Sequence, residues 1–366
     1  MSRTVLLVGG GHAHAAVLAD WITRGLPPGT RAVLLTPSPT LRYSAMVPGW
    51  LAGQHAPDEG LVNLAALAAR AGVDLVLDAC VGVDPDARLV RTHHHDVAFD
   101  VVSFDTGGIA HGTAALGNDA RVTHVRPIDT LVTRLSALPA TARIVLAGGG
   151  AGGVELACGL RNRSRPPLAP SVTLVTGRRG LLPDFAPSVQ RRAARALARQ
   201  AIGVHHADAR IVNHELMAGD VSLEPADAII AAFGSAAPPW VRGSGLATDA
   251  AGFIAVDAHQ RSLSHAHVFA AGDIASRTDC PVAHSGVHAV YAGEVLAANL
   301  RSALQGRLPR AIYRPRRHSL FLLNTGDGSA IASYGPCSAE GRWVLRLKHW
   351  IDRRWVATYA ALAADA

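Results

Sequence analysis

The chain has 366 residues, of which 49% are hydrophobic and 17% charged, and its formal net charge is +7. This composition predicts a globular protein of two or three domains, and it excludes a disordered or membrane-spanning chain, because no apolar run reaches roughly 18–20 residues. The positive charge fits phosphate-bearing cofactors or an anionic membrane surface, and we expect no nucleic-acid partner because no binding module accompanies the arginines.

The first element is an apolar strand, Val5–Val8, which runs into glycines and then into an alanine-rich segment. This order is typical of the strand–turn–helix opening of a dinucleotide-binding βαβ unit. There Gly9 allows the tight turn, and Gly11 lets the backbone approach a pyrophosphate at the start of the helix. Since a strand begins almost at once, we expect no signal peptide and a cytoplasmic location.

The first motif departs from the usual pattern at two positions. A second strand, Ala32–Leu35, ends at Thr36, where an acid usually binds a ribose hydroxyl, and His14 stands in place of the third glycine. The Thr36 hydroxyl can make the same hydrogen bond, but less strongly than a carboxylate. An ordinary strand–helix turn therefore stays open as the alternative.

The segment from residue 42 to residue 49 contains Tyr43 and Met46, which fit packing and cofactor contact equally well. No cysteine precedes Cys80, so a redox-active cysteine pair at this place is excluded. The four cysteines of the chain lie far apart, and they indicate neither a zinc site nor a disulfide framework. A reducing compartment is the simplest setting.

Three consecutive histidines, His93–His95, lie between the expected strands Arg88–Arg91 and Val97–Val102. Neighbours on a strand point to alternate faces, so we expect a polar hairpin tip here and not a metal site. A buried strand then ends in a turn containing Thr106 and Gly107, which we expect to return to the ligand of the first motif.

The glycine pattern recurs after a second apolar strand, Ile144–Ala147, with all three glycines: Gly148, Gly150 and Gly153. Two such openings in one chain indicate two dinucleotides, usually a flavin and a nicotinamide. The next strand, Ser171–Thr176, again ends in threonine, and Arg178 and Arg179 follow. Arginine binds phosphate in a bidentate mode, so NADPH should bind at least as well as NADH, unless the arginines form only a solvated turn.

The helix of the second motif contains Glu155 and Cys158. A carboxylate one turn into a helix is favoured by the helix dipole, which is one explanation of Glu155, and a role beside the nicotinamide is the other. Cys158 lies on roughly the same face, and a buried apolar thiol is the default interpretation of it.

Further on, a strand is expected over Asp227–Ala232, and another leads to Gly272 and Asp273. Ligands bind at the carboxyl ends of strands in open α/β sheets, which makes Asp273 a ligand candidate. A helix is expected over Val282–Leu300, and its start, Ala283–Gly286, offers backbone N–H groups to an acceptor.

The tail from Arg342 to Trp355 has helical periodicity. One stripe is basic, and the other contains Trp343, Leu347 and Trp350. A basic amphipathic helix with tryptophan at its apolar edge fits attachment to a membrane surface. Docking of the apolar stripe onto the core explains the pattern equally well.

The order of these motifs resembles the two-dinucleotide-binding flavoproteins of the pyridine nucleotide-disulfide oxidoreductase superfamily. Within it the match is closest to the branch of type II NADH dehydrogenases and sulfide:quinone oxidoreductases. More narrowly, the chain looks like the flavoprotein domain found fused to selenophosphate synthetase. The resemblance covers essentially the whole chain, and the segments that establish it are residues 9–14, 43–49, 148–155, 253–256, 269–273 and the tryptophan-rich end.

The resemblance implies an α/β fold with two Rossmann-like dinucleotide-binding domains, the second inserted into the first, plus a small C-terminal segment. The expected boundaries are 1–112 for the first part of the FAD-binding domain, 113–236 for the NAD(P)-binding domain, 237–302 for the second FAD part, and 303–366 for a segment that caps the flavin and contacts the inner face of a membrane.

The implied reaction is hydride transfer from NAD(P)H to FAD, followed by passage of electrons to a quinone or another small acceptor. The resemblance places Asp273 on the ribityl chain of the flavin and Glu155 near both rings as the catalytic residue. The helix after Asp273 lacks the glutamines that type II dehydrogenases have near the quinone, so the acceptor stays open. The predicted cofactor contacts are Gly9, Gly11, His12, Ala13, Thr36, Arg42, Thr106, Gly107, Gly148, Gly150, Gly153, Thr176, Arg178, Gly272, Asp273 and His284.

Two other functions stay open. One is a sulfur- or selenium-compound oxidoreductase that uses Cys158 or Cys280. The other is a flavin-binding redox sensor with slow turnover, which the threonines in place of both ribose-binding acids, Thr36 and Thr176, keep as an alternative.

Overall fold

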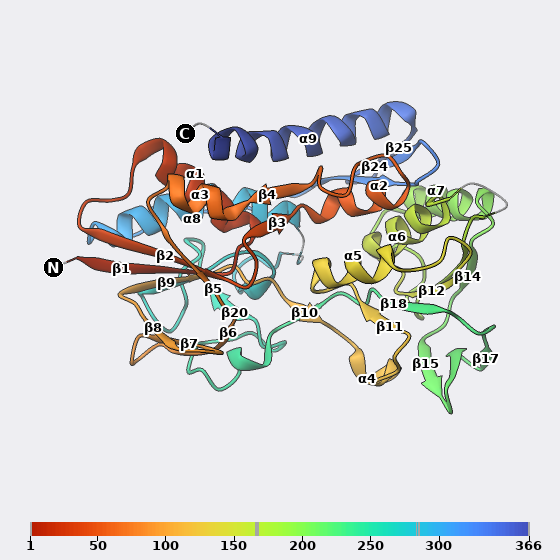
Figure 1. Ribbon diagram of the computed structural model, residues 1–366, viewed down its shortest axis with the longest axis horizontal. Coiled ribbons are helices and arrows are strands. Elements are labelled where there is room, and N and C mark those ends of the chain that lie inside the picture. Colours follow the sequence, from red (N-terminus) through yellow and green to blue (C-terminus); the bar gives the residue numbers. More distant parts are fainter. Residues whose placement is uncertain (1, 165–167, 283, 285, 365–366) are drawn as a thin grey trace.

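The structure is a computed structural model that describes residues 2–164, 168–282, 284 and 286–364. Two five-stranded parallel sheets form the cores of two α/β units that lie side by side (Figure 1). The strand orders are β21-β9-β1-β2-β5 in the first sheet and β11-β18-β12-β13-β14 in the second. Because β21 comes late in the chain and completes the first sheet, the second unit is inserted into the first. The predicted fold class is confirmed.

The first sheet is buried on both faces. It consists of β1 (Arg3–Val8), β2 (Thr30–Thr36), β5 (Asp74–Leu77), β9 (Val101–Phe104) and β21 (Val268–Ala270). On β1 the side chains alternate, so that Leu7 packs toward the helices α1 (His12–Arg24), α3 (Leu64–Arg70) and α8 (Gly286–Leu304), while Leu6 packs on the other side. That other side is covered by the antiparallel strands β6 (Cys80–Asp84), β7 (Leu89–Thr92) and β8 (Asp96–Ala98).

The three histidines His93–His95 connect β7 to β8 and are exposed, which confirms the predicted hairpin tip. In the part of the chain that the structure describes, no group of three or more His, Cys, Asp or Glu side chains could hold a metal ion. The single strand predicted over Val97–Val102 is wrong, because Phe99 turns into the core and the Asp100 carboxylate accepts the Thr4 N–H at 2.7 Å, which separates β8 from β9.

The second unit repeats the arrangement. Its sheet consists of β11 (Val122–His124), β12 (Arg143–Ala147), β13 (Ser171–Val175), β14 (Gly203–His205) and β18 (Ala228–Ala231). Its helices are α5 (Ile128–Ser136), α6 (Ala151–Arg161) and α7 (Pro187–Arg199). A small sheet of β15 (Ala209–Val212), β16 (Glu215–Ala218) and β17 (Val221–Ser222) is attached to it. The strand predicted over Asp227–Ala232 is thus shorter by one residue at each end.

The two chain connections between the units pair with each other through β10 (Ile109–Ala110) and β19 (Ser235–Ala236), which are antiparallel. The remaining short elements are β3 (Thr40–Arg42), η1 (Ser44–Met46), α2 (Val47–Leu51), β4 (Leu61–Asn63), α4 (Thr113–Leu116), η2 (Pro239–Val241), β20 (Ile254–Val256), η3 (Gly272–Ile274) and β22 (Ala275–Arg277). The pairing of β10 with β19 fixes the place where the inserted unit begins and ends.

Helix α8 begins and ends later than predicted. It runs from Gly286 to Leu304 in place of Val282–Leu300. Its buried residues continue through Leu304, which packs in the core of the first unit, and this explains the later end. Val282 precedes the helix and lines a cavity described below.

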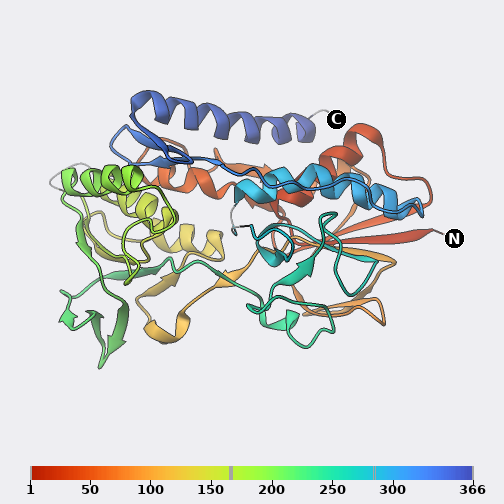
Figure 2. The same ribbon diagram turned by 180° about the vertical axis from the view of Figure 1, so that it is seen from behind.

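The C-terminal segment caps both units and not the first alone. Its antiparallel strands β23 (Leu320–Asn324), β24 (Ala330–Tyr334) and β25 (Cys337–Gly341) pack on α6 and α7, where Leu323 and Ile331 join the core of the second unit. Helix α9 (Arg342–Ala364) then runs back over α1 and α3, where Tyr359 joins the core of the first unit (Figures 1 and 2). No helix in the described ranges is long and apolar enough to cross a bilayer.

Docking of α9 uses a different stripe from the predicted one. The buried residues are Val344, Leu345, Lys348, Asp352, Val356 and Tyr359. Two of the tryptophans assigned to the apolar stripe, Trp343 and Trp350, are 57% and 58% exposed. The helix therefore docks on the core and also presents two tryptophans to solvent.

Helix α6 also contacts α2 of the first unit, and Gly159 makes this contact possible. A Cβ atom at Gly159 would lie 2.6 Å from the Pro48 carbonyl oxygen, which is backbone and cannot move alone. Gly152 on the same helix has no atom within 4 Å of its added Cβ.

We expect Gly159→Ala to lower the free energy of unfolding by about 1–3 kcal/mol, because the two helices must separate to admit the methyl group. Gly152→Ala is the matched control and should be neutral or stabilising by up to about 1 kcal/mol, because alanine favours the helix. Chemical denaturation of both variants tests this. Equal effects of the two substitutions would contradict the close contact.

Candidate functional site

Three turns of the chain meet at the carboxyl edge of the neighbouring strands β21, β9 and β1. Gly9 has φ of +96°, and a side chain there would collide with the backbone of Asp105. A Cβ at Gly11 would collide with the Asp105 carboxyl group, and one at Gly272 would lie 2.5 Å from its Oδ1 atom. Glycine is required at these positions because the turns pack directly against Asp105, against its backbone at Gly9 and against its carboxyl group at Gly11 and Gly272.

Asp105 follows β9 and was missed by the sequence reasoning, although it sits directly before the predicted Thr106 and Gly107 turn. Its Oδ2 atom accepts the N–H groups of Ala13 at 2.8 Å and His14 at 3.0 Å, and thereby caps α1. The side chain is 3% exposed, and burial raises the pKa of Asp105 to about 8, with the Asp273 charge adding to the rise.

His14 explains why the third glycine of the first motif is dispensable. Its ring is buried and bridges Gly9 and Ser103, with Nδ1 2.6 Å from the Gly9 carbonyl oxygen and Nε2 2.8 Å from the Ser103 hydroxyl. Burial lowers the pKa of His14 to about 4, so the ring is neutral near pH 7. The imidazole thus ties the glycine turn to β9 by hydrogen bonds, where the usual glycine would allow only close packing.

Asp273 has the features expected of a ligand-binding carboxylate. It lies in η3 and is 7% exposed, and its Oδ2 atom is 2.5 Å from the Arg126 guanidinium of the second unit. Its Oδ1 atom is buried and has no hydrogen-bond partner in the described structure. A buried carboxylate oxygen without a donor fits a ligand hydroxyl, such as those of a ribityl chain. The neighbouring His12 is partly buried, and loss of solvation lowers the pKa of its ring to about 4.

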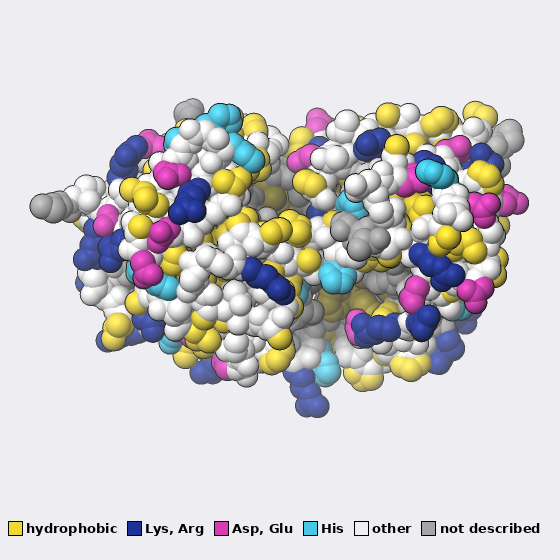
Figure 3. All heavy atoms as spheres, turned by 90° about the horizontal axis from the view of Figure 1, so that it is seen from below, with side chains coloured by type: hydrophobic (Ala, Val, Ile, Leu, Met, Phe, Trp, Pro, Cys, Tyr) yellow, Lys and Arg dark blue, Asp and Glu magenta, His cyan; other side chains and the backbone are white. Residues whose placement is uncertain are grey.

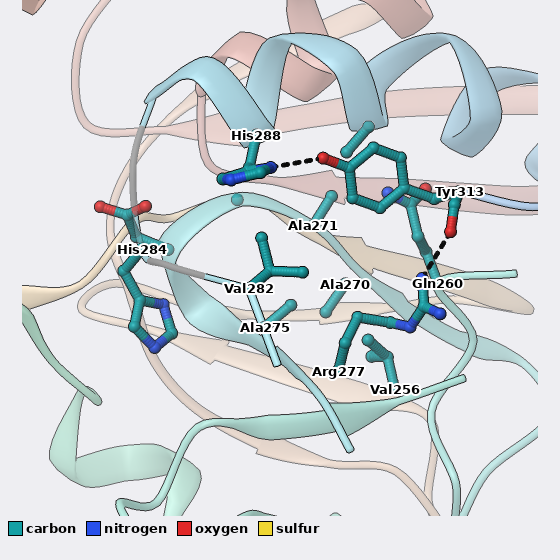
Figure 4. A pocket seen from close by; sticks show the side chains of 13 residues that line it. Val256, Gln260, Ala270, Ala271, Ala275, Arg277, Val282, His284, His288 and Tyr313 are labelled. Carbon is teal, nitrogen blue, oxygen red and sulfur yellow. Dashed lines mark hydrogen bonds between the residues drawn. The ribbon is translucent and has the colours of Figure 1, made fainter. Parts of the chain in front are cut away.

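A cavity extends from Asp273 toward the start of α8 (Figure 4). His288 of α8 and Tyr313 point toward each other, with Nδ1 and the hydroxyl 2.7 Å apart, and Arg277 donates to the Tyr313 carbonyl oxygen at 2.7 Å. The predicted residue His284 lines this cavity and stacks on Phe253 at a ring distance of 4.0 Å. Seen from the side opposite α9, the surface is hollowed between the two units (Figure 3).

Two predictions around this site are left without a direct outcome. Helix α8 begins only at Gly286, and residues 283 and 285, which were expected to offer N–H groups, lie outside the described residues. The hydroxyl of Thr36 donates to the Ser38 carbonyl oxygen at 3.3 Å. The roles of His284 and Thr36 in binding stay predictions.

Arg42 is not part of the cluster around Asp105. Its Nε donates to Asp129 of α5 at 2.7 Å and its Nη1 to the Pro57 carbonyl oxygen at 2.7 Å, so it joins the first unit to the second. The adjacent Tyr43 lies between His12 and α9, with its ring 5.5 Å from His12 and stacked on Trp355 at 4.5 Å. This stack connects the first glycine turn with the C-terminal helix.

The second glycine turn lies between β12 and α6. A Cβ at Gly148, whose φ is +137°, would collide with the Ala232 carbonyl oxygen, and one at Gly153 would collide with the Gly148 carbonyl oxygen. Gly150 has open space instead, with no atom within 4 Å of an added Cβ. The first and third glycines therefore close the turn, and the open side at Gly150 is where a phosphate can approach the start of the helix.

At the end of β13 the structure places a carboxylate that sequence reasoning missed. The Thr176 hydroxyl lies 3.1 Å from Nδ1 of His206, and Asp208, which follows the neighbouring β14, approaches Gly177. Asp208 pairs with the exposed Arg178, with Oδ2 and Nε 2.9 Å apart. Because β13 and β14 are parallel neighbours, an acid after either strand reaches the same edge.

Glu155 lies on α6, partly buried, and its Oε1 accepts the Asn324 N–H at 2.8 Å. Burial raises the pKa of Glu155, and the charge of Lys348 on α9 opposes that rise. Cys158 is buried one turn further on, and burial raises the pKa of its thiol to about 12, so it is a poor nucleophile.

The raised pKa of Asp105 predicts a pH dependence of stability. Between about pH 4 and about pH 8 the folded chain holds a proton at Asp105 that the unfolded chain has lost, so the contribution of this group to the free energy of unfolding falls as the pH rises through that window. Asp105→Asn cannot ionise but keeps an acceptor for the α1 N–H groups. Between pH 5 and pH 8, the free energy of unfolding of Asp105→Asn should therefore fall less than that of the wild type.

Denaturation near pH 5 and near pH 8 measures the difference, with the fully exposed Asp220→Asn as the matched control. A pH dependence that is the same in Asp105→Asn and the wild type would contradict the protonated state.

Comparison with known proteins gives a consistent result. The family model of the pyridine nucleotide-disulphide oxidoreductases matches residues 3–293. No curated protein sequence is similar enough to count as a match.

Solved structures share the fold. The sulfide:quinone oxidoreductase of Aquifex aeolicus is 16% identical, with a TM-score of 0.76 over 99% of this chain and 92% of that one. A NAD-dependent persulfide reductase from A. fulgidus is 17% identical, with a TM-score of 0.76 over 94% of this chain and 66% of that one. The water-forming NADH oxidase of Lactobacillus brevis is 19% identical, with a TM-score of 0.73 over 91% and 75%. Since the family model spans most of the sequence, the chain belongs to the pyridine nucleotide-disulphide oxidoreductase family and is an FAD-dependent NAD(P)H oxidoreductase.

Proposed function

We propose that the chain passes a hydride from NAD(P)H, held by the second unit, to FAD, held by the first, and that the electrons continue to a quinone or another small acceptor. The observation that supports this best is the buried Oδ1 atom of Asp273, which has no partner in the described structure and lies beside the glycine turns that enclose Asp105. Bound FAD supplies the redox chemistry, and the protein binds and orients the reactants.

In the first unit, the glycine turn and the start of α1 face the pyrophosphate, through Gly9, Gly11, His12 and Ala13. Asp273 accepts a ribityl hydroxyl, and the ion pair with Arg126 holds that carboxylate in place. Thr36, Arg42, Thr106, Gly107, Gly272 and His284 complete the proposed contacts.

In the second unit, the turn of Gly148, Gly150 and Gly153 takes the nicotinamide dinucleotide, and Thr176 and Arg178 lie at its adenosine end. Glu155 acts as the catalytic residue near the nicotinamide.

The acceptor defines the main alternative. The names of the sulfide:quinone oxidoreductase and the persulfide reductase keep a sulfur or selenium compound as a candidate, as does the proposed membership in the branch related to the selenophosphate synthetase fusion. Of the two candidate cysteines, Cys280 is exposed and Cys158 is buried with a raised pKa, so this alternative depends on Cys280. Full turnover of the Cys158→Ala and Cys280→Ala double variant with such compounds would remove it.

The reductive half-reaction tests the proposal directly. The visible spectrum of the purified protein, recorded anaerobically, should show a flavin band that bleaches on addition of NADPH or NADH. Asp273→Ala should lower the amount of flavin that copurifies, because the ribityl hydroxyl loses its acceptor. A flavin band that persists with both nucleotides would leave a slow redox sensor or a different electron donor as the better assignment.

We expect NADPH to be used at least as well as NADH. Arg178→Ala should lower kcat/KM for NADPH about tenfold, since a charge-assisted hydrogen bond to phosphate contributes roughly 1.5 kcal/mol, and should leave the value for NADH unchanged. The control is Arg195→Ala, which removes an exposed arginine of α7 and should change neither value. A clear preference of the wild type for NADH would contradict the role of Arg178 in binding the phosphate of NADPH. Asp208 would then be the ribose-binding acid.

We propose that α9 also attaches the protein to the cytoplasmic face of an anionic membrane. The exposed Trp343 and Trp350 support this, as does Arg346, which is exposed between them. The protein should cosediment with vesicles containing phosphatidylglycerol and less so with neutral vesicles, and Trp343→Ser with Trp350→Ser should weaken the binding. Equal recovery of wild type and double variant with anionic vesicles would refute it.

A further inference from the structure

Two side-chain amides, those of Gln54 and Asn324, close a ring of hydrogen bonds with the backbone of Gly326. The Asn324 Oδ1 atom accepts the Gly326 N–H at 2.8 Å, and the Asn324 Nδ2 atom donates to Oε1 of Gln54 at 2.7 Å. The Gln54 Nε2 atom donates in turn to the Gly326 carbonyl oxygen at 3.1 Å. Because the ring begins at a backbone donor and ends at a backbone acceptor, each amide has only one orientation that closes it.

The ring joins three parts of the chain. Gln54 belongs to the first unit, where it follows α2, and its own N–H donates to the Gly49 carbonyl oxygen at 2.8 Å. Asn324 and Gly326 lie at the turn between β23 and β24 of the C-terminal segment. This turn packs so closely on α6 of the second unit that a Cβ atom at Gly326 would lie 2.5 Å from the Cys158 carbonyl oxygen. A shift of any one part would therefore break the ring or cause a collision.

The ring also sets the position of the Glu155 carboxylate. The Asn324 N–H donates to Oε1 of Glu155 at 2.8 Å, so the residue whose side chain closes the ring holds the acid through its backbone. Asn324 is 2% exposed, and Glu155 is partly buried. Within the described ranges this is the one hydrogen bond of the Glu155 side chain, which makes Asn324 the polar contact that fixes the carboxylate.

We propose that Gln54 and Asn324 are positioning residues of the hydride-transfer site, which hold the Glu155 carboxylate in a fixed place relative to the first unit. This rests on the proposed function, in which the nicotinamide binds to the second unit beside Glu155 and the flavin binds to the first. When the C–H bond of the nicotinamide breaks, its electron pair leaves with the hydrogen for the flavin and a cationic ring stays behind. A carboxylate at a fixed distance stabilises that charge as it forms. The two amides therefore act through Glu155.

Anaerobic stopped-flow reduction of the FAD-loaded protein by NADPH tests this. Gln54→Met has a side chain of similar length that cannot form these hydrogen bonds, so it opens the ring and frees the Glu155 carboxylate. The limiting rate constant of flavin reduction should fall about tenfold, because small displacements at a reacting centre are costly. The NADPH concentration that gives half of that rate should change by less than about twofold, because the glycine turn and the adenosine end provide most of the binding.

Gln190→Met is the matched control. The Gln190 side chain of α7 likewise bonds to backbone, since its Nε2 atom donates to the carbonyl oxygens of Leu182 at 3.0 Å and Phe185 at 3.1 Å. It is not part of the ring, so its loss should leave the limiting rate constant unchanged. If Gln54→Met does not fold, Gln54→Asn replaces it. This variant keeps the amide on a shorter side chain and should lower the same rate constant by a smaller factor.

The effect of the ring should pass through Glu155. Glu155→Gln keeps an acceptor for the Asn324 N–H but has no charge, and adding Gln54→Met to it should lower the rate constant no further. A general loosening of the fold would instead add its own loss to that of Glu155→Gln.

Amide hydrogen exchange gives a readout that needs no turnover. The segment 322–328 contains the N–H groups of Asn324 and Gly326, which the ring and Glu155 occupy. This segment should exchange about tenfold faster in Gln54→Met than in the wild type, because opening the ring releases both donors. In Gln190→Met it should exchange as in the wild type.

The proposal is overturned if Gln54→Met is reduced at the wild-type rate, if its half-saturating NADPH concentration rises as much as its rate constant falls, or if it has its full effect on top of Glu155→Gln. Unchanged exchange over 322–328 would also overturn it. A wild-type flavin that neither NADPH nor NADH reduces would count against the proposed function, and faster exchange in Gln54→Met would still support the hold of the ring on Glu155.

Discussion

The first unit depends on the close packing of three chain turns around the Asp105 carboxyl group. Gly11 and Gly272 have no room for a side chain because the Asp105 carboxyl group fills that space, and Gly9 has none because the Asp105 backbone does. It caps α1 from the carboxyl end of β9, at the turn where the proposed function places the pyrophosphate. A charge at this place would repel a phosphate, and burial keeps the group protonated up to about pH 8. The proposed phosphate site of the first unit therefore lies beside an aspartic acid, Asp105, in its neutral form.

Much of this architecture follows from the sequence because it depends on local patterns. Apolar strands that lead into glycines predict β1–α1 and β12–α6, and a buried strand before Gly272 and Asp273 predicts their place at the sheet edge. The residues that were missed act through contacts between distant segments. Asp208 reaches the end of β13 from the neighbouring strand β14, and Asp105 packs against glycines almost a hundred residues earlier in the chain.

The C-terminal helix also has a feature that local sequence patterns do not predict. Helical periodicity in the tail is sufficient to predict α9, but the stripe that docks includes Lys348 and Asp352, two charged residues that a hydropathy pattern assigns to the outside. They are buried as a pair, with Nζ of Lys348 3.1 Å from Oδ2 of Asp352, and a hydropathy pattern does not reveal such pairing. The only signal in the sequence was composition, since a single lysine among so many arginines is unusual.

In the proposed function each of the two rings is held by a different unit. Hydride transfer requires the rings at a fixed separation, so the contacts between the units matter as much as the two binding sites. Charged groups make several of these contacts. Arg126 of the second unit reaches Asp273 of the first, and Arg42 of the first reaches Asp129 of the second. A cation that pairs with an acid of the other unit holds the two units together and also places a charge beside the site. In this chain the relative position of the units and the electrostatics of the site are therefore set by the same side chains.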